Sequence, residues 1–161
     1  FLAKNPEKFY FDSEIAQRAR ISVGACNQAL KELHKLNFVV REKKGRMNFY
    51  QINHENIIVK QLKVFLTTLE VYSFINKIKS YSIKIILFGS SSRGENLSDS
   101  DIDLLIVSHQ KEGIERVIES INNKKIKAIV KTPTELSNLE KNDPTFFSEV
   151  ERGIKLWEKK Q

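Results

Sequence analysis

Hydrophobic and polar positions alternate with different periods along the chain, and each period predicts a different kind of element. Between Val23 and Leu33 apolar residues recur every three or four positions, which predicts an amphipathic helix over residues 22–36. A shorter stripe after Asp12 predicts a preceding helix, and a break near Arg20 leads to Ser22, a candidate cap for the second helix. Two short helices joined by a tight turn form a helix-turn-helix arrangement.

The next apolar runs are shorter and lie at residues 38–42 and 47–52. The segment between them, Lys43-Lys44-Gly45-Arg46, is basic and contains a glycine. Two such runs around a glycine-containing turn predict a β-hairpin with a positively charged tip.

A long stretch without proline or glycine extends from His54 to about Lys79. Apolar residues recur within it at steps of four and three, which predicts one long amphipathic helix. We expect this helix to pack either on the chain's own domains or on the same helix of a second subunit, and we favour a homodimer. The main stripe consists of Ile58, Leu62, Phe65, Leu69 and Tyr72.

The last half of the chain alternates between apolar strands and helical stripes. Strands are predicted at residues 81–88, 102–107 and 126–130, with a helix around residues 114–121. A final helix is predicted to begin at Pro144, with a core stripe of Phe147, Val150, Ile154 and Trp157. This order predicts the α/β (α+β) class, with a small mixed sheet of three or four strands and helices packed on one face.

Charge changes this picture mainly in the first third of the chain. The 161 residues, enough for one ordinary domain or two small ones, carry a net charge of +7. Residues 1–53 hold ten Lys or Arg against five Asp or Glu, which predicts a polyanion-binding N-terminal module.

No apolar run approaches the ~20 residues of a membrane span, and the single cysteine, Cys26, excludes an internal disulfide. We therefore expect a cytoplasmic protein without a membrane partner. The apolar pattern is already under way at Phe1, so we expect further sequence before it.

One segment carries candidate chemistry, and it joins the first two strands of the last half. Gly89 and Ser90 end the first strand, and Asp101 and Asp103 lie two residues apart in the second. Residues two apart on a strand point to the same side, so both carboxylates can reach one cation. A glycine followed by small residues leaves amide groups available to phosphate oxygens. The segment therefore predicts a site for a nucleoside triphosphate with Mg²⁺.

This segment resembles the signature of the DNA polymerase beta-like nucleotidyltransferase superfamily. Its form, Gly-Ser-x-x-Arg-Gly followed by Ser-Asp-x-Asp-Leu at residues 100–104, is typical of the minimal nucleotidyltransferases. The resemblance implies transfer of a nucleoside monophosphate from a nucleoside triphosphate to a hydroxyl group, with Asp101 and Asp103 as catalytic residues and magnesium ligands. Arg93 either contacts phosphate or holds the loop by hydrogen bonds. The implied phosphate contacts come from Gly89, Ser90, Ser91 and Arg93.

The third carboxylate that members of this superfamily use does not appear at its expected position. It comes from a following strand that ends shortly before a Thr-Pro pair and a helix, and in the matching strand here Lys127 takes its place. An ammonium group at that position repels cations. Three interpretations remain open. Lys127 pairs with Asp101 and Asp103 in a degenerate site; a partner chain or another acid completes the site; or the alignment is shifted and Lys127 merely faces outward.

The two N-terminal helices and the hairpin together resemble a winged helix-turn-helix domain. The resemblance implies double-stranded DNA as a partner, with the second helix in the major groove and the hairpin, or wing, on phosphate. The alternative is a winged helix used for protein contact. The predicted DNA contacts are Ser22, Asn27, Gln28 and Lys31 of the second helix, and Lys43, Lys44 and Arg46 of the wing.

These patterns predict three parts: a winged helix-turn-helix domain at residues 1–53, a linker and dimerisation helix at 54–79, and a minimal nucleotidyltransferase domain at 80–161. We expect a DNA-binding transcriptional regulator that transfers nucleoside monophosphates if its site is active. The alternative is a non-enzymatic regulator or antitoxin-like protein, whose degenerate domain only binds a nucleotide or a protein partner. Minimal nucleotidyltransferases are often paired with a separate helical toxin, so the resemblance also implies a partner of that kind.

Overall fold

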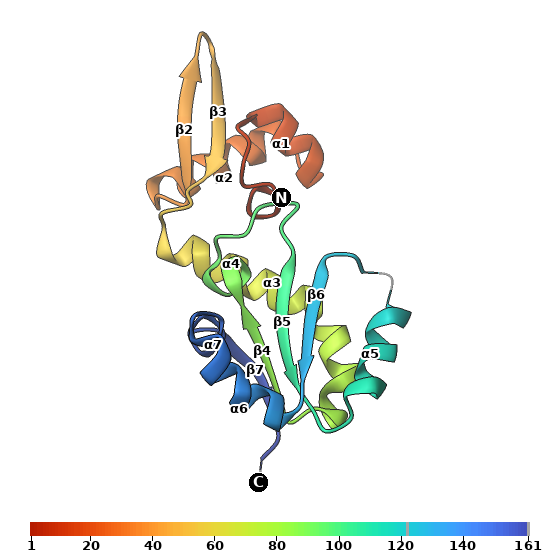
Figure 1. Ribbon diagram of the computed structural model, residues 1–161. Helices are drawn as coiled ribbons and strands as arrows, with labels where there is room; N and C mark the ends of the chain where they lie inside the picture. The colour runs from red at the N-terminus through yellow and green to blue at the C-terminus, as the bar shows by residue number, and fades with distance from the viewer. Residues whose placement is uncertain (122, 161) are drawn as a thin grey trace. The chain divides into compact units, whose positions relative to one another are not determined.

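The computed structural model describes residues 1–121 and 123–160. The chain forms two compact units, Phe1–Lys63 and Val64–Gln161, called here the N-terminal and C-terminal units. Figure 1 gives the order of the elements along the chain. None of the helices in the described part of the chain is both long and apolar enough to cross a membrane.

The N-terminal unit contains two helices and a three-stranded antiparallel sheet with the strand order β1-β3-β2. The predicted helix pair and hairpin are confirmed at the level of these elements, whereas the two-residue strand β1 was not predicted. In order the elements are η1 (Leu2–Lys4), β1 (Tyr10–Phe11), α1 (Asp12–Ala19), α2 (Val23–Lys35), β2 (Val39–Lys44) and β3 (Met47–Ile52).

Local contacts explain where the two helices begin and end. Arg20 adopts a left-handed conformation with φ of 57°, which ends α1 and turns the chain. The Ser22 hydroxyl then accepts a hydrogen bond of 3.2 Å from the Ala25 amide, so Ser22 caps α2 as predicted. Cys26 is buried on the inner face of α2, where burial raises the pKa of its thiol.

The predicted long helix is present as α3 (Ile57–Ile78), which begins three residues later than expected. The side-chain oxygen of Asn56 accepts hydrogen bonds from the amides of Ile58 at 2.9 Å and Val59 at 3.3 Å, which places the start of the helix. One face of α3 is buried, and Val71, Phe74, Ile75 and Ile78 belong to the core of the C-terminal unit. Several large apolar side chains on the other face are exposed.

The C-terminal unit is built on a four-stranded mixed sheet with the order β6-β5-β4-β7. Strands β5 and β6 are parallel, and β4 is antiparallel to both β5 and β7, so the predicted mixed sheet is confirmed. The first strand is shorter than predicted, because Tyr81 belongs to the turn η2. The elements are η2 (Lys79–Tyr81), β4 (Lys84–Phe88), α4 (Gly89–Arg93), β5 (Ile102–Val107), α5 (Lys111–Ser120), β6 (Ile126–Lys131), α6 (Pro133–Asn142), α7 (Pro144–Glu151) and β7 (Ile154–Glu158).

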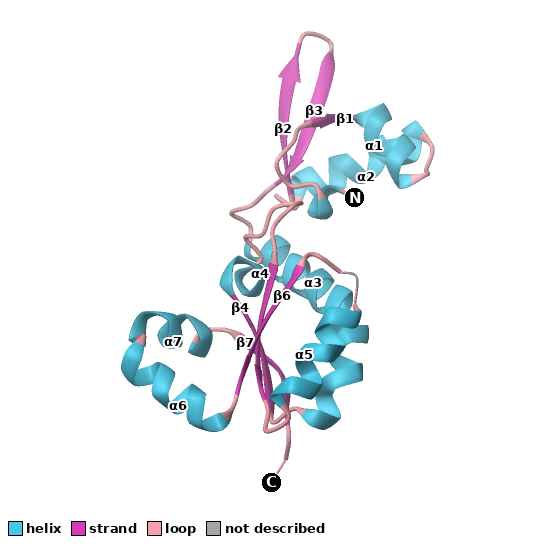
Figure 2. Cartoon of the chain, turned by 45° about the vertical axis from the view of Figure 1, so that its right-hand side comes forward, coloured by secondary structure: helices cyan, strands magenta, loops and turns pink. Residues whose placement is uncertain are grey.

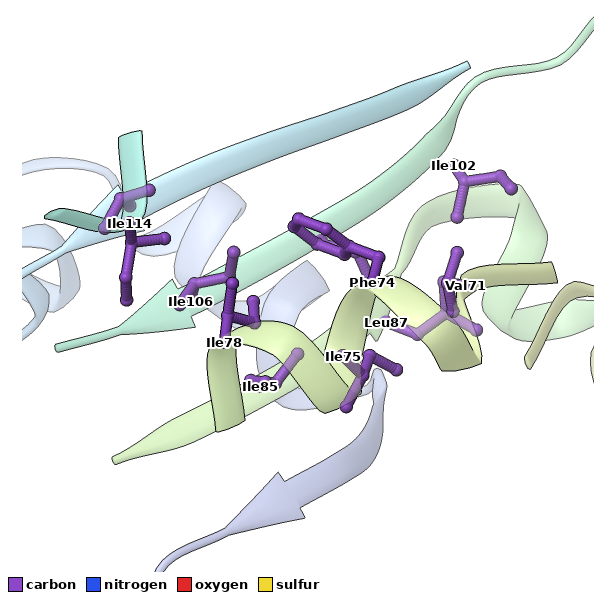
Figure 3. Packing of buried hydrophobic residues seen from close by; sticks show 11 residues of the cluster. Val71, Phe74, Ile75, Ile78, Ile85, Leu87, Ile102, Ile106 and Ile114 are labelled. Carbon is purple, nitrogen blue, oxygen red and sulfur yellow. The ribbon is translucent and has the colours of Figure 1, made fainter. Parts of the chain in front are cut away.

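Helices cover both faces of this sheet, which corrects the prediction that they pack on one face. Figure 2 shows α3 and α5 on one side of the strands and α6 and α7 on the other. The first side holds the larger core, in which Phe74 and Ile78 of α3 meet Ile106 of β5 and Ile114 of α5 (Figure 3). On the second side Phe146 and Val150 of α7 cover Phe88, Leu105 and their neighbours. The side chains of β4 and β5 are apolar on both faces of the sheet, so helices must cover both faces.

The final helix ends at Glu151, so the prediction that it continues through Ile154 and Trp157 is wrong. Residues 154–158 form β7, which pairs antiparallel with β4. Gly153 makes the change possible, because an added Cβ there would lie 2.5 Å from the backbone oxygen of Leu87. The apolar residues from 147 to 157 happen to have helical spacing, and the close approach at Gly153 is visible only in three dimensions.

Candidate functional site

The junction of β4 and β5 brings the glycine turn against a carboxylate. Phe88, the last residue of β4, is paired with Asp103 of β5, and the chain turns immediately afterwards at Gly89. Gly89 has φ of 69°, and a Cβ atom built on it would lie 2.7 Å from Oδ2 of Asp103. The backbone conformation therefore favours glycine at this position, and any larger residue would also have to displace the Asp103 carboxylate. The junction holds the start of the Gly-Ser segment beside the second aspartate of the predicted pair.

Asp103 is the second residue of β5 and is half-buried, whereas Asp101 lies directly before the strand and is exposed. The prediction that both aspartates lie within the strand is therefore correct only for Asp103. Burial raises the pKa of the Asp103 carboxyl, and the charges of Asp101 and Glu149 raise it further. Lys127 lowers the pKa of Asp103 and is the smallest of these four influences. Negative charge therefore outweighs positive charge at Asp103, which is the condition that attracts a cation.

Two serines of α4 shape the segment between the glycine and the aspartates. Ser91 is fully buried, and its hydroxyl donates a hydrogen bond of 3.2 Å to the backbone oxygen of Asp101. The Ser92 hydroxyl donates to the backbone oxygen of Gly89 at 2.8 Å. Ser90 is half-buried. The hydroxyl of Ser91 thus holds the aspartate-bearing strand, whereas Ser90 is the more accessible serine of the predicted phosphate contacts.

Lys127 lies directly beside Asp103 in the sheet. The parallel pairing of β5 with β6 places the two residues in register, so their side chains leave the same face. The Lys127 side chain is exposed, and the ion pairs found among the described residues do not join it to either aspartate. The structure thus places a lysine at the strand position where a third carboxylate is expected, next to the carboxylate pair but not bonded to it.

Arg93, at the end of α4, connects the motif to α7. Its Nε atom donates to Glu95 at 2.8 Å, and its Nη1 atom lies 3.9 Å from Oε1 of Glu149. The same arginine lines an open cavity of about 550 Å³, together with residues from one face of α7. Pro144, Thr145, Ser148 and Glu149 of α7 line it, together with Arg152 directly after the helix.

Sequence reasoning did not find the part of the site that comes from α7. Glu149 influences Asp103, and Arg152 adds a second arginine to the cavity, but neither belongs to a recognisable motif. The available signal was their spacing, since residues 145, 148, 149 and 152 share one face of a helix. That spacing alone does not reveal which neighbour the face meets.

The donor set suits one magnesium ion better than two. Among the described residues, no group of three His, Cys, Asp or Glu side chains is arranged to hold a metal ion. Mg²⁺ is commonly held by one or two carboxylates together with substrate phosphates. Asp101 and Asp103 could supply the two carboxylates. A second ion that activates an attacking hydroxyl would need a further carboxylate, and Lys127 stands in that place.

The predicted DNA contacts all lie in the N-terminal unit. Ser22, Gln28 and Lys31 are exposed on or beside α2, while Asn27 is half-buried. Lys43, Lys44 and Arg46 are exposed at the hairpin tip, where Lys44 pairs with Glu42 at 3.3 Å. The hydroxyl oxygen of Ser22 is already occupied by the helix-capping hydrogen bond.

Comparison with known proteins gives a family match and likenesses to solved structures. Residues 70–155 match the family described as "Nucleotidyltransferase domain". A crystal structure of "a putative nucleotidyltransferase from Sulfolobus solfataricus" shares 19% sequence identity, with a TM-score of 0.40. The alignment covers 64% of this chain and 87% of that chain. No curated protein matches the chain.

Proposed function

The chain belongs to the nucleotidyltransferase domain family, and from that membership we propose that its C-terminal unit binds a nucleoside triphosphate together with Mg²⁺. The binding residues in this proposal are Gly89, Ser90, Asp101 and Asp103. The close contact between Gly89 and Asp103 supports it most directly, because a phosphate-binding turn and a metal-binding carboxylate are useful together only when adjacent. The cavity beside Arg93 has the volume of a small-molecule site.

The electrostatics at Asp103 support cation binding despite Lys127. Asp101 and Glu149 act on Asp103 more strongly than Lys127 does. In the proposed complex, Asp101 and Asp103 hold the magnesium ion that accompanies the triphosphate. The backbone amides at Gly89 and Ser90 bind phosphate oxygens. Arg93 fixes the end of α4 through Glu95 and Glu149, and it presents its remaining donors to the cavity.

Nucleotidyl transfer is the second part of the proposal. Magnesium, when bound, would polarise the phosphate that is attacked and stabilise the departing pyrophosphate. The residues of this chain position the triphosphate for attack by a hydroxyl group of an acceptor. Because Lys127 stands where we expect the carboxylate that would help to activate that hydroxyl, we expect the protein to bind the triphosphate but to transfer its nucleoside monophosphate slowly.

Titration calorimetry of the full chain with ATP, GTP, CTP and UTP tests the binding proposal. We expect at least one triphosphate to bind in the presence of magnesium and to bind much more weakly after magnesium is removed. Asp101→Asn and Asp103→Asn should each abolish the magnesium dependence. Asp99→Asn is the matched control, because Asp99 is an exposed aspartate in the preceding loop. Absence of heat with all four nucleotides would overturn the proposal.

We further propose that the N-terminal unit is a winged helix-turn-helix domain that binds double-stranded DNA. The supporting observation is the placement of Lys43, Lys44 and Arg46 at an exposed hairpin tip, in a part of the chain with a basic excess. Together the two proposed activities describe a transcriptional regulator that responds to a nucleotide.

Salt-dependent DNA binding tests the second proposal. Replacing Lys43, Lys44 and Arg46 with alanine should weaken binding and reduce the slope of log affinity against log salt by about two to three, since each lost phosphate contact changes it by about one. The control replaces three exposed lysines of the C-terminal unit, Lys124, Lys159 and Lys160. An unchanged slope in the hairpin variant, or an equal change in the control, would count against the wing.

A further inference from the structure

We propose that Arg152 binds the terminal phosphate of the nucleoside triphosphate, and that it thereby makes the site select triphosphates over diphosphates and monophosphates. This inference rests on the proposed binding of a triphosphate beside Gly89. It adds a specificity residue that belongs neither to the glycine turn nor to the aspartate pair. Three observations carry it: the position of Arg152 along the sheet, the cavity that it shares with Arg93, and the lack of a partner for its side chain.

The backbone places Arg152 at the same end of β4 as the glycine turn. Leu87 of β4 is paired with Ile154 of β7. Because the two strands are antiparallel, two residues beyond this pair the chain reaches Gly89 on one side and Arg152 on the other. Gly153 allows a close approach here, since an added Cβ would lie 2.5 Å from the backbone oxygen of Leu87. The backbone of Arg152 is therefore held beside the end of β4, where the proposed phosphate-binding turn starts.

Arg152 lines the open cavity of about 550 Å³ together with Arg93, the last residue of α4. Since α4 begins at Gly89, the cavity lies beside the helix that carries the proposed phosphate contacts. Glu149 also lines the cavity and connects it to the metal side of the site, because its charge acts on Asp103. The cavity has the volume of a small-molecule site, so it has room for the end of a triphosphate.

Of the two arginines in the cavity, Arg152 is the one with its whole guanidinium available. Arg93 donates to Glu95 at 2.8 Å and lies 3.9 Å from Oε1 of Glu149, so two carboxylates already surround it. In the part of the chain that the structure describes, the exposed side chain of Arg152 makes no ion pair or hydrogen bond. A guanidinium presents its N–H donors in a planar fork that binds phosphate oxygens in pairs. Arg152 can therefore bind an anion without giving up a bond within the protein.

The order of the phosphates indicates which of them Arg152 meets. In the proposed transfer, the acceptor hydroxyl attacks the first phosphate, which must therefore lie beside Asp101 and Asp103. The second and third phosphates leave together as pyrophosphate, so they extend beyond the attacked phosphate and along the turn at Gly89. The third phosphate is the farthest from the aspartates, and it is the one that can reach the guanidinium of Arg152.

Arg152 is also the C-cap residue of α7, where a positive charge by itself stabilises a helix. A purely structural role of this kind would change the free energy of unfolding. It would not change the preference of the site for a triphosphate over a diphosphate. The ratio of these two affinities therefore separates the two roles.

Titration calorimetry of the full chain with magnesium tests the inference. The ligands are the tightest binder among ATP, GTP, CTP and UTP, and the diphosphate and monophosphate of the same nucleoside. We expect wild type to bind the triphosphate most tightly. Arg152→Ala should weaken triphosphate binding roughly tenfold or more, because charge-assisted hydrogen bonds are lost, and leave the other two affinities nearly unchanged. Arg152→Lys keeps the charge and should recover part of the loss.

Arg116→Ala is the matched control, since Arg116 is an exposed arginine of α5, which covers the opposite face of the sheet (Figure 2). It should leave the binding of all three nucleotides unchanged. Equal losses for triphosphate and diphosphate in Arg152→Ala, or a lower free energy of unfolding with unchanged affinities, would overturn the inference and leave the proposed nucleotide binding intact. A wild type that binds none of the triphosphates would overturn the proposed function and this inference together.

Discussion

Two neighbouring junctions in the C-terminal sheet, the β4–β5 pair at Gly89 and the β5–β6 pair at Lys127, differ in how tightly the fold restricts the residue beside Asp103. At the junction of β4 with β5, Gly89 has a positive φ of 69°, and a Cβ atom there would displace the carboxylate of Asp103. At the junction of β5 with β6, Lys127 stands beside the same aspartate with its side chain exposed and unbonded to it. The backbone conformation therefore favours glycine at the first junction, whereas the exposed residue at the second junction is open to change.

In the proposed function, this difference separates the residues that bind the nucleotide from the position that would assist transfer. The first junction contains the turn and carboxylate that the proposed triphosphate complex needs. The second contains the position from which a third carboxylate would assist the attacking hydroxyl. A chain can replace that exposed residue without disturbing the sheet, so the catalytic part of such a site can be lost while the binding part is retained.

The largest effect should come from breaking the first junction with Gly89→Ala. The added Cβ would lie 2.7 Å from Oδ2 of Asp103, and φ of 69° is strained for alanine. We expect nucleotide binding to be lost and the free energy of unfolding to fall by about 1–3 kcal/mol. Calorimetry and urea denaturation measure the two quantities.

Gly113→Ala is the matched control for that substitution. Gly113 lies within α5, and an added Cβ there meets no atom within 4 Å. Alanine should therefore leave nucleotide binding intact and stabilise the protein by roughly 0.5–1 kcal/mol, as expected in a helix. Equal behaviour of the two variants would show that the restriction at Gly89 is unimportant.

The sequence predicted the first junction well because its signals are local. A glycine at the end of an apolar run and two aspartates at strand spacing are visible in one short segment. The cap at Ser22 and the hairpin around Gly45 were predictable for the same reason. The chemistry at these positions depends on residues that are close in sequence.

The contributions of α6, α7 and β7 were harder to predict because they depend on distant contacts. Apolar residues at 147, 150, 154 and 157 fit a helix, but Gly153 packs against Leu87 and the chain becomes a strand. Glu149 acquires its influence on Asp103 only after α7 has packed on the second face of the sheet. The capping box of Thr132 and Glu135 was a usable signal for α6, since both of its hydrogen bonds form.

A smaller effect should come from changing the second junction. Lys127→Asp removes a cation and supplies a carboxylate at the position in register with Asp103. We expect magnesium-dependent nucleotide affinity to rise about tenfold and any transfer activity to increase, because repulsion of the metal ion becomes attraction. Lys127→Met separates the two causes, as it removes the charge without adding a ligand. If Lys127→Asp binds magnesium nucleotide no better than wild type, position 127 does not belong to the metal site.

The charges around Asp103 can also be measured directly by NMR titration of its carboxyl group. Lys127→Met should raise the pKa of Asp103 further, because the ammonium of Lys127 lowers it. Glu149→Gln should shift the same pKa in the opposite direction, because the negative charge of Glu149 raises it. Shifts of the same sign in the two variants would contradict the arrangement of β6 and α7 around Asp103.

The smallest expected effect is the pH dependence that Asp103 gives to the free energy of unfolding. Its pKa is higher in the folded chain than its ordinary value, chiefly through burial, so the folded state binds the proton more tightly than the unfolded state. Stability from this group is therefore greatest in acid and declines as the pH rises through the pKa of the folded state. Asp103→Asn cannot ionise, so its free energy of unfolding should exceed that of wild type at neutral pH and approach it in acid. Urea denaturation across the acidic to neutral range measures the difference, with Asp99→Asn as the exposed control. A variant that is less stable than wild type at neutral pH would show that Asp103 makes favourable contacts that outweigh its burial, and the first junction would then contribute to stability as well as to the site.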